Sequence, residues 1–303
     1  MPATETLLLA RTLIDEMVGA VGLPKMAAFQ KLFWSLFGGL MIRFAELGLT
    51  FDRLVASSGL PKASQWALSF FCHPAAGRGL EHIPPDGPLL VTSNHPGAYD
   101  ALVIFSHLNR PDIRWISSEI PFLDNLPHTR QHIIFASRVN AAQRTAALRA
   151  AIRHLRGGGA LLYFGAGHRD PDPAVYAGAA QAMEAWLPGI DFFFRHVPGL
   201  RLLPTVVSGV ISTYWARHPI TWLRRKQIDQ QRLSEFGQVI SQLLRPGRLM
   251  LTPRLSFGPG ADFETLQAES SPADILPAVI RREKALLAEH MQSAETARPA
   301  AAQ

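Results

Sequence analysis

The sequence predicts an α/β fold in which a mixed, largely parallel sheet is flanked by helices and preceded by further N-terminal helices. Short apolar runs with strand character alternate with helical patterns from residue 88 onward, as in βαβ units. Two helical patterns come first, at residues 4–20 and 25–49. A loop rich in Pro and Gly at residues 74–87 marks the boundary between the two parts. A chain of 303 residues, 48% hydrophobic and 18% charged, is long enough to bury a large core.

The longer N-terminal helix contains an apolar segment. Residues 32–42 are apolar on all sides, but 11 residues are well short of the roughly 20 that a helix needs to cross a bilayer. Lys31 and Arg43 flank this segment, as is typical of a helix that lies in a membrane interface. The pattern therefore favours membrane-associating N-terminal helices. A helix buried against the body of the protein is the alternative interpretation.

Beyond the boundary loop, strands and helices follow one another. The predicted strands cover residues 88–92, 113–117, 133–136, 160–164, 202–207 and 248–257. The predicted helices cover residues 99–108, 141–156, 174–186 and 271–290. The chain is therefore divided into a helical region at residues 1–75, an α/β domain at 76–260, a C-terminal helix at 261–290 and a flexible tail at 291–303.

The charge and the cysteine content indicate the compartment and the class of partner. The net charge of +6 comes from 30 basic and 24 acidic residues, and only five of the basic residues are lysines. Arginine suits phosphate groups and anionic membrane surfaces. The sequence has no zinc-finger spacing, RNA-binding block or basic repeat, so we expect no nucleic-acid partner. Cys72 is the only cysteine, and residues 1–20 lack the features of a signal peptide. We therefore expect peripheral or monotopic attachment to the cytoplasmic face of a membrane.

Residues 213–226, with the sequence TYWARHPITWLRRK, interleave aromatic and cationic side chains. Amphipathic rings and basic groups gather at a membrane–water interface. A helix cap that packs on the protein body and exposes its arginines has the same composition. Both interpretations remain open for this segment.

The residues NHPGAYD at positions 94–100 follow the first predicted strand and precede a helix. The imidazole of His95 should therefore lie at the carboxyl edge of the sheet, where α/β folds build their sites. Because Pro96 and Gly97 make a sharp turn, Asp100 can fold back onto one imidazole nitrogen. That contact would fix the tautomer and leave the other nitrogen free as a base. A polar histidine without a catalytic role, followed by an aspartate that caps the helix, is the plainer interpretation.

The NHPGAYD segment resembles the His-x4-Asp block of the glycerolipid acyltransferase family, which includes the lysophosphatidic acid and glycerol-3-phosphate acyltransferases. Further segments follow in the order of that family: IIFASR at 133–138, FGAGHR at 164–169 and LLPTVV at 202–207. The third block departs from the family's Phe-Pro-Glu-Gly-Thr-Arg. Gly165, Ala166 and His168 stand where the family has proline, glutamate and threonine.

The resemblance implies an acyltransferase that moves a fatty acyl group from acyl-CoA or acyl-carrier protein to a hydroxyl of a lysophospholipid-like acceptor. His95 would be the general base and Asp100 the residue that orients it. Arg138 and Arg169 would bind phosphate groups of the acceptor or the donor. No cofactor is implied, because the acyl thioester is a co-substrate. A non-catalytic lipid-binding or membrane-scaffold relative and an acyl-thioester hydrolase are the alternatives.

The altered third block bears on the acceptor. Gly167 would let a ligand approach the backbone closely. Alanine at position 166 carries no charge and accepts no side-chain hydrogen bond. Either the acceptor is not glycerol phosphate and His168 supplies a new polar contact, or the site is weak or inactive. The intact pair of His95 and Asp100 favours the first explanation.

Two further groups of residues have alternative interpretations. Arg169 could form an ion pair with the adjacent Asp170 or Asp172 instead of binding a phosphate. His128 and His132 have the spacing of some zinc ligands, but no glutamate follows the first histidine. We therefore expect loop histidines there and no metal site.

Overall fold

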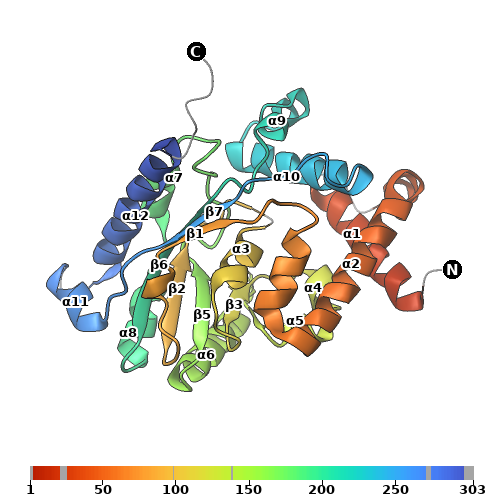
Figure 1. Cartoon of the computed structure of the whole chain (residues 1–303). Helices are drawn as coiled ribbons and strands as arrows, with labels where there is room; N and C mark the ends of the chain where they lie inside the picture. The colour runs from red at the N-terminus through yellow and green to blue at the C-terminus, as the bar shows by residue number, and fades with distance from the viewer. Residues whose placement is uncertain (1–2, 21–25, 98, 138, 271–273, 297–303) are drawn as a thin grey trace, which may run out of the picture.

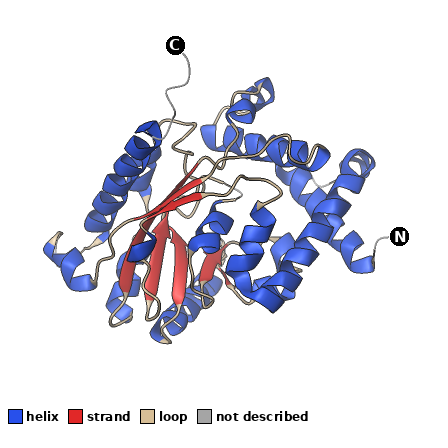
Figure 2. Cartoon of the chain, viewed as in Figure 1, coloured by secondary structure: helices blue, strands red, loops and turns tan. Residues whose placement is uncertain are grey.

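In a computed structural model described for residues 3–20, 26–97, 99–137, 139–270 and 274–296, the chain forms one seven-stranded sheet covered by helices on both faces (Figures 1 and 2). In sheet order the strands are β1 (Ala76–Arg78), β7 (Arg254–Phe257), β6 (Arg201–Ser208), β2 (Leu89–Ser93), β5 (Ala160–Phe164), β3 (Arg114–Ser117) and β4 (Ile133–Phe135). The strands from β6 to β4 are parallel, and β7 runs antiparallel to β6. The predicted mixed, largely parallel sheet is confirmed.

The helices surround this sheet. In chain order they are α1 (Thr4–Ala20), α2 (Ala27–Leu68), α3 (Asp100–His107), α4 (Pro121–Asp124), α5 (Pro127–Arg130), α6 (Ala141–Arg156), α7 (Ala179–Ala182), α8 (Gly189–His196), α9 (Thr213–Ala216), α10 (Gln227–Leu244), α11 (Phe263–Ala268) and α12 (Leu276–Thr296). The short 3-10 turns are η1 (Leu80–His82), η2 (Met183–Ala185) and η3 (Pro219–Leu223).

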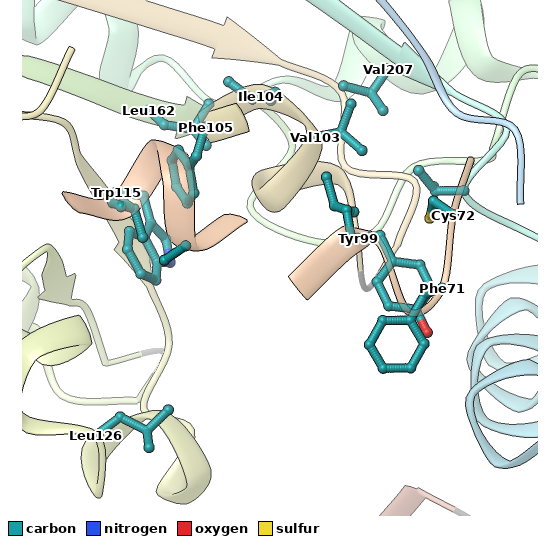
Figure 3. Close-up of a cluster of buried hydrophobic side chains, with 14 of the residues drawn as sticks. Phe71, Cys72, Tyr99, Val103, Ile104, Phe105, Trp115, Leu126, Leu162 and Val207 are labelled. Carbon is teal, nitrogen blue, oxygen red and sulfur yellow. The ribbon is translucent and has the colours of Figure 1, made fainter. Parts of the chain in front are cut away.

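Buried side chains of the central strands alternate between the two faces of the sheet. Leu89 and Val91 of β2 join the cluster that includes residues of α1, α2 and α3, whereas Leu90 joins the cluster of α6, α8 and α12. Successive side chains of a strand point to opposite faces, so covering both faces requires nearly continuous apolar strands. Figure 3 shows part of the first cluster, in which the rings of Phe71 and Tyr99 stack with their centroids 5.2 Å apart.

The N-terminal region contains the predicted helix at residues 4–20, which is α1. The second helix, α2, continues to Leu68, far beyond its predicted end at residue 49. It is broken at Gly59, whose φ of 81° lies in the left-handed region, and Pro61 lies in the first turn of the second part. Val55 and Leu60 are buried on either side of the break, beyond residue 49, so tertiary packing stabilises a segment that the sequence pattern did not identify as helical.

Two predicted elements are shorter than expected. Within residues 174–186 only α7 and η2 are helical, and Gly178 precedes them with a φ of 90°. The strand expected over residues 248–257 is limited to β7. Pro253 precedes β7 and has no N–H to donate to a sheet ladder.

The C-terminal helix α12 begins at Leu276 and continues to Thr296, whereas we expected a helix over residues 271–290 and a tail from 291. The predicted residues 271–273 and 297–303 lie outside the described residues. The helices α8 and α10 were not predicted. The second of these lies above α3 in the view of Figure 1 and contributes to the site described next.

Candidate active site

His95 lies in the turn between β2 and α3. Its Nδ1 is 2.7 Å from Oδ2 of Asp100, the first residue of α3. The same Oδ2 accepts the N–H of Gly97 at 2.9 Å, and Oδ1 accepts the N–H of Ala101 at 2.6 Å. Because a carboxylate only accepts hydrogen bonds, the shared proton belongs to Nδ1 of His95. Nε2 is then the basic nitrogen of the imidazole.

Charged neighbours tune this histidine. Burial alone would lower the pKa of His95, but the carboxylate of Asp100 outweighs burial and the net effect raises the pKa. Arg169 acts to lower the same pKa and Glu235 acts to raise it. The imidazole also stacks on Phe164 of β5, with ring centroids 4.2 Å apart. Asp100 therefore favours the imidazolium that forms when His95 accepts a proton.

Hydrogen bonds join the turn of His95 to the ends of the neighbouring strands. The Asn94 amide donates from Nδ2 to the carbonyl of Val207 and accepts the N–H of Val207 at Oδ1, each at 2.9 Å. The N–H of His95 donates to Oδ2 of Asp170, and the N–H of Asp170 donates to the carbonyl of His95, each at 2.9 Å. The segments after β2 and β5 and the end of β6 are thus tied together around the imidazole.

A cavity of about 720 Å³ is lined by His95 and Asp100. Most of the other lining residues are apolar and come from α2, α4, β3, β5 and α6, among them Phe44, Leu47, Trp115, Phe122, Leu148 and Phe164. Among the described residues, the arginines in the lining are Arg144, Arg169 and Arg232. An apolar cavity with a few polar groups at one place is typical of a binding site for a small molecule.

The residues expected from the third sequence block lie at this cavity. Gly167, His168 and Arg169 follow β5 and all line it. Gly167 has a φ of 64°, and a Cβ at this position would lie 2.9 Å from Cδ1 of Leu187. His168 is exposed, with its Nδ1 3.0 Å from the backbone oxygen of Arg169. Arg138, the other predicted anion contact, lies outside the described residues.

Arg169 pairs with Glu235 of α10. Its Nε donates to Oε1 of Glu235 at 2.8 Å. The alternative interpretation, an ion pair of Arg169 with a carboxylate, is therefore present, but the expected partners Asp170 and Asp172 were wrong. These two carboxylates accept backbone N–H groups. Asp170 accepts from His95, and Asp172 accepts the N–H groups of residues 174 and 209–211. Burial raises the pKa of both aspartates, and these bonds partly oppose the rise.

Ala166, where the resembled family has a glutamate, belongs to the apolar core. It is 4% exposed and lies in the same buried cluster as Met183 and Trp186. The neighbouring Gly165 lies so close to Trp186 that a Cβ would be 2.0 Å from Cδ2 of the indole. The loop after β5 therefore packs on the residues around Trp186, and a carboxylate at position 166 would be buried among apolar side chains.

Helix α10 supplies residues at the candidate site that the sequence analysis did not identify. Four of its buried polar side chains recur at spacings of four, three and four residues, at Gln231, Glu235, Gln238 and Gln242. Such spacing is the periodicity of one helix face, which is usually apolar when it is buried. The three glutamines form hydrogen bonds with polar groups of segments that are distant in the sequence or in neighbouring loops. Gln231 bonds to the backbone of Pro96 and Asp170, and Gln238 bonds to the backbone of Val210 and Ser212. Gln242 bonds to the backbone of Phe71 and Leu249 and to the hydroxyl of Tyr99.

The two closely spaced histidines have separate partners. Nδ1 of His128, which lies in α5, is 2.8 Å from Oδ2 of Asp52, and Nδ1 of His132 is 2.8 Å from the carbonyl oxygen of Ile113. Within the part of the chain that the structure describes, no group of three or more His, Cys, Asp or Glu is arranged to hold a metal ion.

Comparisons with known proteins found one family and a solved structure to which the chain is similar. The sequence profile of the Acyltransferase family matches residues 76–208, which run from β1 to the end of β6 and include His95 and Asp100. Among solved structures, the chain is similar to the 1-acyl-sn-glycerophosphate (LPA) acyltransferase PlsC from Thermotoga maritima, with 19% sequence identity, a TM-score of 0.46, and coverage of 98% of this chain and 99% of that chain. No curated protein sequence matches the chain. Residues 76–208 of this chain are thus similar in sequence to the Acyltransferase family.

Proposed function

We propose that this protein transfers a fatty acyl group from acyl-CoA or acyl-carrier protein to a hydroxyl of a lysophospholipid-like acceptor. The observation that carries the proposal is the pair of His95 and Asp100, with 2.7 Å between Nδ1 and Oδ2, in the lining of a largely apolar cavity. The aliphatic and aromatic lining suits an acyl chain. The free Nε2 of His95 suits removal of a proton from a hydroxyl.

In the proposed reaction, Nε2 of His95 takes the proton of the acceptor hydroxyl as the hydroxyl oxygen attacks the thioester carbonyl carbon. A carbon–oxygen bond forms, and the former carbonyl oxygen carries the negative charge of the tetrahedral intermediate. The carbon–sulfur bond then breaks, and the leaving thiolate takes the proton from the imidazolium. Asp100 stabilises that imidazolium by accepting the Nδ1–H bond. General-base assistance of this kind contributes ~10²–10⁴-fold to the rate.

We assign the anionic parts of the substrates to cationic side chains near His95. Arg169 lines the cavity, and a guanidinium is suited to a phosphate group or to the charge that develops in the transition state. Arg138 has the same proposed role. Gly167 would allow close approach of the acceptor, and His168 would contact its head group. Lysophosphatidic acid is the default acceptor in this scheme.

We propose that the enzyme works at the cytoplasmic face of a membrane and is attached by its N-terminal helices. Among the described helices, α2 is the one whose length and apolar composition would allow it to cross a membrane. Of its most apolar stretch of 18 residues, 28% is buried inside the protein. Large apolar side chains on or beside α1 and α2 are exposed, namely Leu8, Met26, Leu32 and Leu36. An exposed apolar face suits a helix that lies in the interface between lipid and water.

The aromatic and basic segment at residues 213–226 has two parts with different environments. Trp215 packs on α10, where a Cβ at Gly237 would lie 2.2 Å from Cε3 of the indole. By contrast, Trp222 is 72% exposed and Leu223 is 79% exposed at the end of η3. The nearby Arg225 and Lys226 are also exposed. We propose that this exposed part is a second membrane contact.

We propose the following domains and functions along the chain. Residues 76–260 form the acyltransferase α/β domain, and residues 1–75 form the helical region that docks on the membrane. Residues 261–290 contain most of the C-terminal helix, which packs on β6 through the cluster it shares with α6 and α8 and also contacts β7. The tail assigned to 291–303 begins inside α12, which ends at Thr296.

An assay with labelled acyl-CoA or acyl-carrier protein and a panel of lyso- and amino-lipid acceptors tests the proposed reaction. We expect the parent protein to form acyl lipid and the His95→Ala variant to lose ~10²-fold or more of that rate. His82→Ala, at a histidine in η1 outside the cavity lining, is the matched control. Thioester cleavage without acyl lipid would indicate a hydrolase, and lipid binding without turnover would indicate a scaffold. Either result would overturn the proposal.

A further inference from the structure

A buried carboxylate from outside the matched family segment lies against the turn that carries His95. Glu235 belongs to α10, beyond residues 76–208. Its side chain is 7% exposed, and its Oε1 accepts from Nε of Arg169 at 2.8 Å. A Cβ at Gly97 would lie 2.5 Å from that Oε1. The carboxylate therefore lies directly beside Gly97, and the absence of a side chain at Gly97 makes this approach possible.

The preceding turn of α10 bonds to the loop after β2 and to the loop after β5. Nε2 of Gln231 donates to the carbonyl of Pro96 and, at 2.8 Å, to the carbonyl of Asp170. Gln231 and Glu235 are four residues apart and so lie on one face of the helix. Together they hold the loop after β2, which carries His95, and the loop after β5, which carries Arg169.

The loop after β5 does not itself bring a carboxylate to Arg169. Ala166 lies in the apolar cluster, and the carboxylates of Asp170 and Asp172 accept backbone N–H groups. A guanidinium that is largely buried needs a compensating charge. For Arg169 that charge comes from α10, through Glu235.

We propose that Glu235 is a positioning residue of the acyl-transfer site, which holds the guanidinium of Arg169 beside His95 and supplies from α10 the carboxylate that position 166 lacks. The kinetic part of this inference rests on the proposed function. Glu235 anchors Arg169 through Nε, and the two Nη groups, held in the planar guanidinium, would remain to bind an anionic group of the substrate. Loss of the anchor would leave the arginine in several rotamers and would leave its charge poorly compensated.

A titration of the His95 imidazole by NMR tests the inference without any turnover. The imidazole signal is assigned by its loss in His95→Ala. Because Glu235 acts to raise the pKa of His95, Glu235→Gln should lower that pKa. Glu283→Gln is the matched control, since Glu283 is a fully buried carboxylate of α12 that bonds to Thr92 instead of Arg169. It should leave the His95 titration unchanged.

Kinetics test the positioning role. We expect Glu235→Ala to lower kcat/KM about 10²-fold, the cost of a misplaced binding group. Glu235→Gln should cost less, because its amide oxygen still accepts from Nε of Arg169. In Glu235→Gln the acidic limb of the pH profile of kcat/KM should move to lower pH together with the pKa of His95. In an Arg169→Ala background, Glu235→Ala should have little further effect, because both changes remove one interaction.

Each result has a defined consequence. An unchanged His95 titration in folded Glu235→Gln, or full additivity of the two alanine changes, would overturn the positioning role. If Glu235→Ala does not fold, as judged by circular dichroism, Glu235→Gln decides the outcome. If the parent protein shows no acyl transfer, the proposed function fails, and the NMR titration still decides whether Glu235 acts on the group at His95.

Discussion

Replacing Asp100 by asparagine should remove most of the activity, because the structure has no place for an amide NH2. Oδ2 of Asp100 accepts from Nδ1 of His95 and from the N–H of Gly97, while Oδ1 accepts from the N–H of Ala101. Either orientation of the asparagine amide would therefore direct an NH2 group at a backbone N–H. With the NH2 toward Gly97, His95 would have to place its proton on Nε2 and would no longer be a base at that nitrogen. With the NH2 toward Ala101, the charge that stabilises the imidazolium is lost.

The expected size of the effect follows from these contacts. Loss of the oriented base should lower kcat by ~10²–10⁴-fold. One buried N–H group without an acceptor should lower the free energy of unfolding by ~1–3 kcal/mol. Initial rates at saturating donor and acceptor measure the first quantity, and urea unfolding measures the second. Asp124→Asn, at an exposed aspartate of α4, is the control. An Asp100→Asn protein with kcat within about 10-fold of the parent would refute the assignment of His95 as an oriented base.

Three further perturbations test other parts of the structure. His290 lies between the hydroxyls of Ser208 and Ser256, and burial lowers its pKa from 6.5 to about 4. As the pH falls, His290 of the unfolded chain is therefore protonated at a higher pH than His290 of the folded protein. Between pH 6.5 and pH 4 the parent should lose up to about 3 kcal/mol of its free energy of unfolding relative to His290→Asn. Urea unfolding of both proteins at a series of pH values measures this difference. Gly97→Ala would place a Cβ against the carboxylate of Glu235. It should therefore lower the free energy of unfolding by ~1–3 kcal/mol and should also lower the activity. An unchanged melting temperature would contradict the close contact between Gly97 and Glu235. Replacing Trp222 and Leu223 by serine should weaken binding to anionic vesicles, measured by co-sedimentation, about 10-fold or more at an unchanged melting temperature. The reason is that each exposed side chain would bury apolar area only in the membrane. Binding equal to that of the parent would exclude this membrane contact.

The contact between His95 and Asp100 could be predicted because its determinants are local. Both residues lie in the segment 94–100, between a strand and a helix. A sharp turn at that point brings side chains five positions apart into contact, and the strand order places the turn at a sheet edge. The fold class was predictable for a similar reason, because alternating apolar strands and helices restrict the arrangement of a sheet.

Helix α10 could not be predicted in the same way. Gln231, Glu235, Gln238 and Gln242 occupy its buried face, and a pattern of polar residues indicates a solvated face. The burial of these side chains depends on partners far away in the sequence, as when Gln242 donates to the carbonyl of Phe71 at 2.7 Å. No local pattern encodes such partners. The role of the helix in the site therefore became visible only from the tertiary structure.

The ion pair of Arg169 shows that hydrogen bonding of backbone N–H groups can determine which carboxylate a cationic side chain contacts. Buried loops contain N–H groups that need acceptors. Asp172 accepts the N–H groups of Gly209, Val210 and Ile211 at 2.9–3.0 Å, and Asp170 accepts that of His95. Asp172 uses both of its oxygens in this way and Asp170 uses Oδ2, and the ion pair of Arg169 is formed with a carboxylate from another element, Glu235. Glu235 lies on the helix that covers both loops, so the pairing of Arg169 follows from how the loop backbones are satisfied and not from proximity along the chain.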